Sequence, residues 1–215
     1  MLRIAAQHDD RKALEILQKE SASAGTSMGP GTRSHFGGRS DVQGVICTAS
    51  YYIDKAQVPV RLQVDAHEPA VTLALPTQPA DGRDATATSQ ADMPTSSIEE
   101  ADSVRVPLSR LAQARSGDKG NDANIGVLAR QPEWVPVLQQ QLTAARVRDY
   151  FAHLMEGQVT RFALPGIGAF NFLLERALGG GGSCSLRSDP LGKCYAQMLL
   201  DMEVSCPRAL LAAAP

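Results

Sequence analysis

A polar stretch near the middle of the chain sets the main limit on how this sequence can fold. Residues 75–102, LPTQPADGRDATATSQADMPTSSIEEAD, are rich in Ala, Thr, Ser, Pro and Asp and contain almost nothing that a core could bury. Such a segment cannot offset the entropy lost on ordering its backbone, so its composition predicts a flexible linker. We place this linker at residues 67–103 and expect one unit on each side, at 1–66 and 104–210.

Length and hydrophobicity favour a soluble chain with modest cores. The 215 residues are 43% hydrophobic, which suffices for one or two units of roughly 100 residues each. No run approaches the ~20 apolar residues that span a bilayer. Asp9 and Asp10 lie too close to Met1 for a signal peptide or an Arg-rich transit peptide. We therefore expect a cytoplasmic protein without a membrane partner.

Charge is unevenly distributed between the two halves of the chain. Residues 1–103 carry 9 Lys and Arg against 14 Asp and Glu, whereas residues 104–215 carry 12 against 9, which gives −5 and +3. A dispersed surplus of three falls short of the basic stripe and the pI above ~9 that are typical of nucleic-acid binding. We expect no nucleic-acid partner, and the positive half suits a small anionic ligand.

Cysteines and histidines show no metal-binding pattern, and we expect neither a metal nor a cofactor. The cysteines lack CxxC spacing and the density of a secreted disulfide scaffold, which favours reduced, buried or incidental thiols. If SDPLGK closes a hairpin, Cys184 and Cys194 do not lie opposite each other. The histidines lack ligand spacing. These residues are Cys47, Cys184, Cys194, Cys206, His8, His35, His67 and His153.

The first unit has the pattern of an incomplete α/β segment. Its expected elements are a strand at 2–6, a helix capped by Asp9 or Asp10, a glycine-rich loop at 27–41, and strands at 45–53 and 58–64. Pro59 would leave the start of the last strand outside the ladder, or place that strand at an edge. One helix covers too little of a sheet this size, so we expect part of a larger domain.

The second unit has a denser pattern that predicts an α+β fold. Its expected elements are a hairpin of strands 104–108 and 124–128, a helix at 133–141, a helix from Thr143 to Gly157, a strand at 159–163, a helix at 169–178, and a hairpin of 185–187 with 194–204. This order fits an antiparallel sheet with helices on one face.

The segment ARSGDKGNDANIGV, residues 114–127, is the strongest candidate site. Glycines that let backbone N–H groups face one concavity, next to cationic side chains, can hold a phosphate or a carboxylate. The GxxxxGK[ST] spacing of a Walker A loop is missing. The alternative is a polar hairpin whose Asp and Asn side chains satisfy the turn. The candidate residues are Arg115, Ser116, Gly117, Asp118, Lys119, Gly120 and Asn124.

Two later segments could add to this site. In RFALPGIGAFNF, Gly166 precedes the expected helix, whose free N–H groups could bind an anion near Asn171, although a plain strand-to-helix turn explains the same residues. In SLRSDPLGK, Arg187 and Lys193 flank a turn and would join the first loop only if both hairpins open at the same end. The alternative is a pair of solvated edge charges. The run Gly179–Gly182 is longer than a helix cap needs, and implies either a mobile loop or a close approach.

No familiar catalytic set accompanies these residues, so an enzymatic role stays open. Ser116 lacks the GxSxG elbow, and Cys184 has no activating neighbour beyond glycines. Ser116, Asp118 and Lys119 lie on adjacent positions that rarely aim at one point.

Three ordered motifs carry a resemblance to a known family. ARSGDKGNDANIGVLAR, RFALPGIGAFNFLLERALGGGG and SLRSDPLGK together resemble the C-terminal ferredoxin-like domain of the acyclic terpene utilisation (AtuA) family. Upstream, LRIAAQHDDRKALEI, FGGR and VPVRLQV resemble the closing part of the larger AtuA core domain. The resemblance implies that most of that core domain is missing here. Residues carried over from the later motifs are Arg161, Pro165, Asn171, Arg187 and Lys193.

The resemblance implies a role in the breakdown of branched acyl-CoA or carboxylic acid compounds of the acyclic terpene type, without supplying a reaction. Our first hypothesis is a protein that binds an anionic acyl-CoA or carboxylate ligand. The second is a non-catalytic assembly module of a larger acyl-CoA-processing complex, with a second copy or the AtuA core domain as partner.

Overall fold

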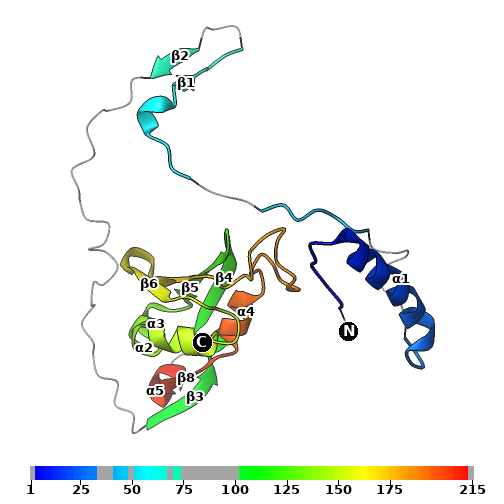
Figure 1. Cartoon of the computed structure of the whole chain (residues 1–215). Coiled ribbons are helices and arrows are strands. Elements are labelled where there is room, and N and C mark those ends of the chain that lie inside the picture. Colours follow the sequence, from blue (N-terminus) through cyan, green and yellow to red (C-terminus); the bar gives the residue numbers. More distant parts are fainter. Residues whose placement is uncertain (1–2, 33–40, 48–50, 67–69, 74–101, 213–215) are drawn as a thin grey trace.

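The computed structural model describes residues 3–32, 41–47, 51–66, 70–73 and 102–212 (Figure 1). Most of the expected linker and the FGGR segment at 36–39 lie outside these described residues. The proposed division into units at 1–66, 67–103 and 104–210 therefore stays a prediction.

The N-terminal part contains one long helix and a small hairpin. Helix α1 spans Arg11–Ser27, and the Asp10 side chain accepts a hydrogen bond from the Lys12 N–H, which confirms the expected cap. A 3-10 turn, η1 (Lys55–Gln57), precedes strands β1 (Val60–Leu62) and β2 (Val71–Leu73), which pair antiparallel. The expected strand at 2–6 is wrong, because residues 3–6 form no ladder. The described ends of the expected strand at 45–53 form none either.

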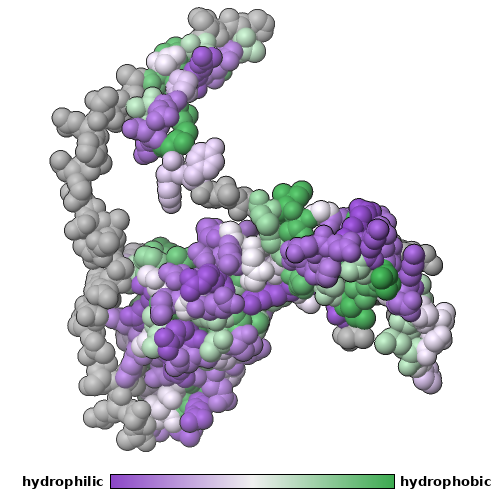
Figure 2. Space-filling view, in the orientation of Figure 1, coloured by the Kyte–Doolittle hydropathy of each residue, from purple (hydrophilic) through white to green (hydrophobic). Residues whose placement is uncertain are grey.

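Apolar residues of this N-terminal part remain at the surface. Figure 2 shows hydrophobic residues exposed on both α1 and the β1–β2 hairpin. Ile16 on α1 is 61% exposed, and Leu62 on β1 is 49% exposed. No residue described between positions 3 and 73 is buried. These elements therefore have no hydrophobic core of their own within the described residues.

The C-terminal part is built on a four-stranded antiparallel sheet. Its strands are β4 (Ala112–Lys119), β5 (Asp122–Ala129), β6 (Val159–Leu164) and β7 (Ala169–Leu174), in the spatial order β4-β5-β7-β6. A separate two-stranded ladder pairs β3 (Ser103–Pro107) with β8 (Glu203–Pro207). All of these pairings are antiparallel.

Helices cover one face of the sheet, as expected for an α+β, ferredoxin-like fold (Figure 1). The α-helices are α2 (Val135–Gln141), α3 (Ala144–Tyr150), α4 (Tyr195–Leu200) and α5 (Arg208–Ala212), and the 3-10 turns are η4 (Leu108–Arg110), η5 (Pro132–Trp134) and η6 (Pro165–Ile167). Thr143 caps α3 by accepting from the Arg146 N–H at 3.2 Å, as its position predicts. The helix ends at Tyr150, several residues before Gly157.

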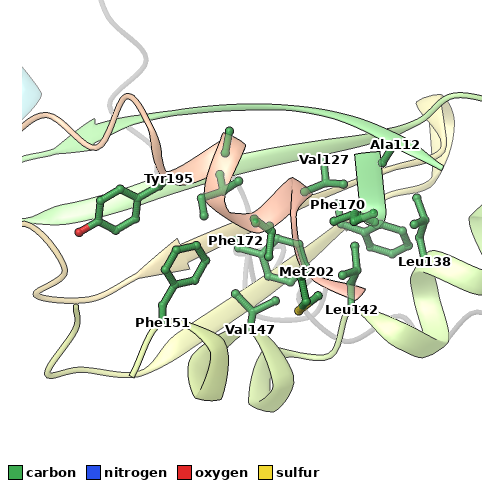
Figure 3. Close-up of a cluster of buried hydrophobic side chains, with 14 of the residues drawn as sticks. Ala112, Val127, Leu138, Leu142, Val147, Phe151, Phe170, Phe172, Tyr195 and Met202 are labelled. Carbon is green, nitrogen blue, oxygen red and sulfur yellow. The ribbon is translucent and has the colours of Figure 1, made fainter. Parts of the chain in front are cut away.

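The core lies between these helices and the facing side of the sheet (Figure 3). In β5 the residues Ala123, Ile125 and Val127 are buried, whereas Asn124 and the other alternate residues stay at least partly exposed. Phe151 stacks on Tyr195 with ring centroids 5.4 Å apart. Burying an aliphatic or aromatic side chain of this kind contributes about 1.5–3 kcal/mol. The opposite side of the sheet is consequently free of the core and carries polar residues.

Residues 169–178 form a strand where we expected a helix. The spacing of Phe170, Leu173 and Leu174 fits a helix, but Phe170, Phe172 and Leu174 also alternate, and all three are buried. A short apolar run cannot be assigned by periodicity alone. Pairing of β7 with β5 on one side and β6 on the other decides between the two patterns.

Two further expected pairings are wrong. The strand at 103–107 pairs with β8, and β5 pairs instead with 112–119, so that most of the supposed loop is strand β4. The connection between β4 and β5 is the two-residue turn Gly120–Asn121, with Gly120 at φ +68°. The expected strand at 194–204 is helix α4 followed by β8, and residues 185–187 form no strand.

The four-glycine run is a tight loop that packs against this turn. Each of its glycines has a positive φ, between +36° and +100°. A Cβ on Gly181 would lie 2.2 Å from the Gly120 carbonyl oxygen, and the Gly180 N–H donates to Asn121 Oδ1 at 2.7 Å. Close approach of a second backbone therefore explains glycine at 181.

Replacing Gly181 by alanine should destabilise the chain more than replacing Gly182. Both positions have positive φ, which costs an L-residue about 1–2 kcal/mol, but a Cβ on Gly182 meets nothing within 4 Å. We expect Gly181→Ala to lower the free energy of unfolding by about 1–3 kcal/mol more than Gly182→Ala, measured by urea denaturation of the full chain. Equal losses would contradict the contact with Gly120.

Candidate functional site

A shallow depression lies at the end of the β4–β5 hairpin, on the side of the sheet away from the core. Its volume is about 380 Å³. It is lined by seven of the predicted residues and one other: Arg115, Ser116, Gly117, Asp118, Lys119, Asn124, Lys193 and Gly126. The structure thus brings the first candidate segment and Lys193 of the third together.

Strand alternation places the cations of β4 on one face. Arg115, Gly117 and Lys119 lie two positions apart along β4, so all three face the same side of the sheet. In the ladder, Gly117 pairs with Asn124 and Arg115 pairs with Gly126. Because both glycines lack a side chain, the backbone forms the floor of the depression between the charged groups.

Lys193 reaches the depression from a turn that precedes α4. The Asp189 carboxylate accepts from the Lys193 N–H at 2.9 Å and from the Cys194 N–H at 2.8 Å. The Ser116 hydroxyl donates to the Lys193 carbonyl oxygen at 3.2 Å and accepts from the Ala196 N–H at 2.9 Å. Ser116 therefore joins β4 to the start of α4 and fixes the backbone that carries Lys193.

Three cations and one carboxylate determine the charge of the depression. Lys193 Nζ lies 3.6 Å from Asp118 Oδ1, and Lys119 Nζ donates to the Asp118 carbonyl oxygen at 3.1 Å. The Lys193 side chain is 61% exposed, so this ion pair contributes little to stability. Arg115, Lys119 and Lys193 together outnumber Asp118 by two charges, which makes the depression attractive to an anion.

Gly120, Asn171 and Gly166 do not line the depression. Gly120 forms the adjacent hairpin turn, and Asn171 lies on β7 opposite Gly126, two strands from Arg115. Gly166 lies in η6, the turn between β6 and β7, and no helix begins there. The expected anion site at a helix N-terminus has therefore lost its structural basis, because the following residues continue as a strand.

Arg161 links a strand to a helix end. Its guanidinium donates to the carbonyl oxygens of Gln139 at 2.8 Å and Leu142 at 3.0 Å. It also lies over the Phe170 ring, 5.4 Å from the centroid. These contacts satisfy the last carbonyl groups of α2 and hold that helix against β6.

Arg187 joins three segments away from the depression. Its guanidinium donates to the carbonyl oxygens of Leu154 and Ala177, and to the Tyr195 hydroxyl at 3.3 Å. Burial raises the pKa of Tyr195, while the positive charge of Arg187 opposes that increase. The four predicted cations Arg115, Lys119, Arg187 and Lys193 thus do not come together, because the Arg187 guanidinium is held by the fold.

Sequence reasoning missed two residues of this arrangement. Gly126 lines the depression, and its signal was a glycine within the alternating strand pattern at 122–129. Asp189 holds the Lys193 backbone, and its signal was the Asp-Pro-x-Gly turn. Neither pattern specifies which other segment the residue approaches.

Residues 106–205 match the family model described as the AtuA ferredoxin-like domain. This part of the chain is an AtuA ferredoxin-like domain. The match includes all four strands of the sheet and every residue that lines the depression. It supports membership of the AtuA family. The resemblance of the upstream segments to the AtuA core domain lies outside the matched range and stays a prediction. No curated protein and no solved structure matches the chain.

Two absences apply to the described part of the chain. Within it, no three His, Cys, Asp or Glu side chains gather where they could hold a metal ion. None of its helices has the length and hydrophobicity needed to cross a bilayer.

Arg187 and Lys193 should differ sharply when each is replaced by methionine in the full chain. Arg187→Met leaves the Leu154 carbonyl oxygen without its donor and removes one of the two donors to the Ala177 carbonyl oxygen, and we expect a loss of about 3 kcal/mol in the free energy of unfolding. Lys193→Met removes an exposed charge and should change that free energy by at most ~0.5 kcal/mol. Urea denaturation measures both. A larger loss for Lys193→Met would contradict the structural role given to Arg187.

Proposed function

We propose that the AtuA ferredoxin-like domain binds a small anionic ligand in the depression at the end of the β4–β5 hairpin. The observation that supports this is the grouping of Arg115, Lys119 and Lys193 around the glycines at 117 and 126. This grouping of charges and the membership of the AtuA family together lead us to propose an acyl-CoA or a branched carboxylic acid as the ligand. The protein would then act in the catabolism of compounds of the acyclic terpene type.

Each polar group has a defined part in this proposal. Arg115 offers a planar guanidinium that can donate two parallel hydrogen bonds to a carboxylate or phosphate. Lys119 and Lys193 add point charges, and the Asn124 amide can donate a further hydrogen bond. The glycines allow an anionic group to approach the sheet without meeting a Cβ. Bound anion would compete with Asp118 for Lys193, whose ion pair is exposed.

The groups in the depression suit recognition better than covalent chemistry. The Ser116 hydroxyl donates a hydrogen bond to the Lys193 carbonyl oxygen and accepts one from the Ala196 N–H. It is therefore not oriented as a nucleophile toward a substrate. Lys119 and Lys193 are exposed, and no described histidine lines the depression. We therefore propose ligand binding as the role of this domain and assign no reaction to it.

Removing a cation from the depression should weaken binding of CoA and short branched acyl-CoAs. We expect Lys119→Ala and Arg115→Ala each to raise the Kd by about tenfold, equivalent to ~1.4 kcal/mol. Isothermal titration calorimetry of the full chain at low salt measures the Kd, and higher salt should weaken binding because these charges are exposed.

Arg105→Ala is the matched control, because Arg105 is an exposed cation on β3 outside the depression. It should leave the Kd unchanged. A free branched carboxylic acid, titrated in parallel, separates carboxylate from phosphate recognition. No heat at millimolar ligand, or equal losses in Arg105→Ala and Lys119→Ala, would overturn the proposal.

The second candidate function is an assembly module that pairs through the open face of the sheet. Leu128 and Leu164 lie in one cross-strand row on either side of Ala169, and each is 41% exposed. Ile167, in the adjoining turn, is 67% exposed. An apolar row of this kind on a sheet face favours contact with another protein surface.

Self-association through this face should depend on Leu128. If the chain forms dimers, Leu128→Asp should shift the protein to monomer, because a charge would be buried in the interface. Sedimentation velocity over a range of concentrations measures this shift. Ile16→Asp, on α1, removes an even more exposed apolar residue elsewhere and should have no effect. A wild-type chain that is monomeric at all concentrations would count against assembly with a second copy.

A further inference from the structure

The N-terminal segment at 41–47 contacts residues 179–184 of the AtuA ferredoxin-like domain, which consist of the four-glycine run, Ser183 and Cys184 and are called the glycine-rich loop below. Cys47 Sγ lies 3.1 Å from Cys184 Sγ, although the two residues are 137 positions apart. Cys184 Sγ is also 3.3 Å from the Ile46 carbonyl oxygen, to which the Ser183 hydroxyl donates. Two consecutive residues of one segment thus meet two consecutive residues of the other.

We propose that Cys47 and Cys184 are a redox-active thiol pair that closes to a reversible disulfide and ties residues 41–47 to the glycine-rich loop. Both thiols are free in the structure. A disulfide has an S–S length of ~2.05 Å, so the sulfur atoms need to approach by about 1 Å. Gly182, two residues before Cys184, has open space where a Cβ would lie, and glycine backbone can absorb a shift of that size.

The environment of the four cysteines distinguishes this pair from the other two. Cys206 is buried, and burial raises its pKa, which disfavours the reactive thiolate. Cys194 is exposed, but the contact between two cysteine sulfur atoms that the described residues show is the one between Cys47 and Cys184. From the sequence we expected all four cysteines to be reduced, and no sequence pattern places Cys47 near that loop.

A disulfide such as oxidised glutathione can serve as the oxidant. The exposed Cys47 thiolate attacks it, forms a mixed disulfide and releases one glutathione thiolate. The Cys184 thiolate then attacks the Cys47 sulfur, forms the Cys47–Cys184 bond and releases the second glutathione. Two protein thiols are oxidised, one glutathione disulfide is reduced to two thiols, and the two protons pass to glutathione. In the reduced pair the hydrogen bond to Cys47 raises the pKa of Cys184. Both steps need a thiolate, so closure should become faster as the pH rises.

Peptide mapping of the full chain tests this pairing. After treatment with glutathione disulfide, alkylation of free thiols and digestion with trypsin, we expect a disulfide between peptides 40–55 and 177–187 in the monomer band of a non-reducing gel. Peptide 194–208, which holds the other two cysteines, should carry the alkyl group. Dithiothreitol should restore all four free thiols.

Single variants separate the two steps. Cys184→Ser should accumulate glutathione on Cys47, because the resolving thiol is absent, and Cys47→Ser should yield no linked peptide. Cys194→Ser is the matched control and should form the linked peptide to the same extent as wild type.

Unfolding the chain provides the decisive comparison. In urea the short loop between Cys184 and Cys194 closes more easily than the long loop between Cys47 and Cys184. The bond between Cys184 and Cys194 should therefore replace the bond between Cys47 and Cys184. The same pairing in native and unfolded protein would overturn the proposal. So would wild-type protein that carries only glutathione on Cys47, or native links that involve Cys194.

Discussion

The register of the β4–β5 pair is the constraint on which the rest of this domain depends. The two-residue turn at Gly120 fixes the pairing of Lys119 with Asp122 and, from there, of every residue along the hairpin. Because side chains alternate between faces, a slip of one residue would bring Ile125 to the solvent side and Asn124 into the core. Burial of Ile125 and its neighbours against the helices makes such a slip costly, and the same register sets the cations on the open face.

Helix α4, the turn that carries Lys193 and the glycine-rich loop all contact this hairpin through small polar side chains or glycines. Ser116 connects the edge strand to α4, and Asp189 orders the turn that brings Lys193 to the hairpin. At the other side, Gly181 lets the glycine-rich loop lie against the Gly120 turn. That loop also carries Cys184, so the proposed ligand site and the proposed thiol pair lie at neighbouring positions around one turn. Arg187 supports the arrangement from within by joining carbonyl groups of different segments.

Prediction from the sequence succeeded where one pattern excluded its alternatives. The caps at Asp10 and Thr143 and the strand before Pro165 were found at their expected places. It failed for 169–178 and for 194–204, because short apolar segments fit a helix and a strand equally well and neighbouring strands decide between them. The anion site expected near Gly166 was lost together with the helix at 169–178. Of the predicted site, the compact motif at 115–124 holds together, whereas Arg161 and Arg187 are used by the fold.

The sequence alone determined the α+β class, the likeness to the AtuA ferredoxin-like domain and the concentration of charge and glycine at 114–127, since all of these depend on local pattern and composition. Only the tertiary structure decided which cations share a surface. Lys193 and Arg187 stand six positions apart in one motif, yet one reaches the depression and the other holds three segments together. Likewise, no sequence pattern near Cys47 indicates that its side chain contacts Cys184. Contacts between residues distant in sequence depend on strand order and loop packing, which arise only when the whole domain is folded.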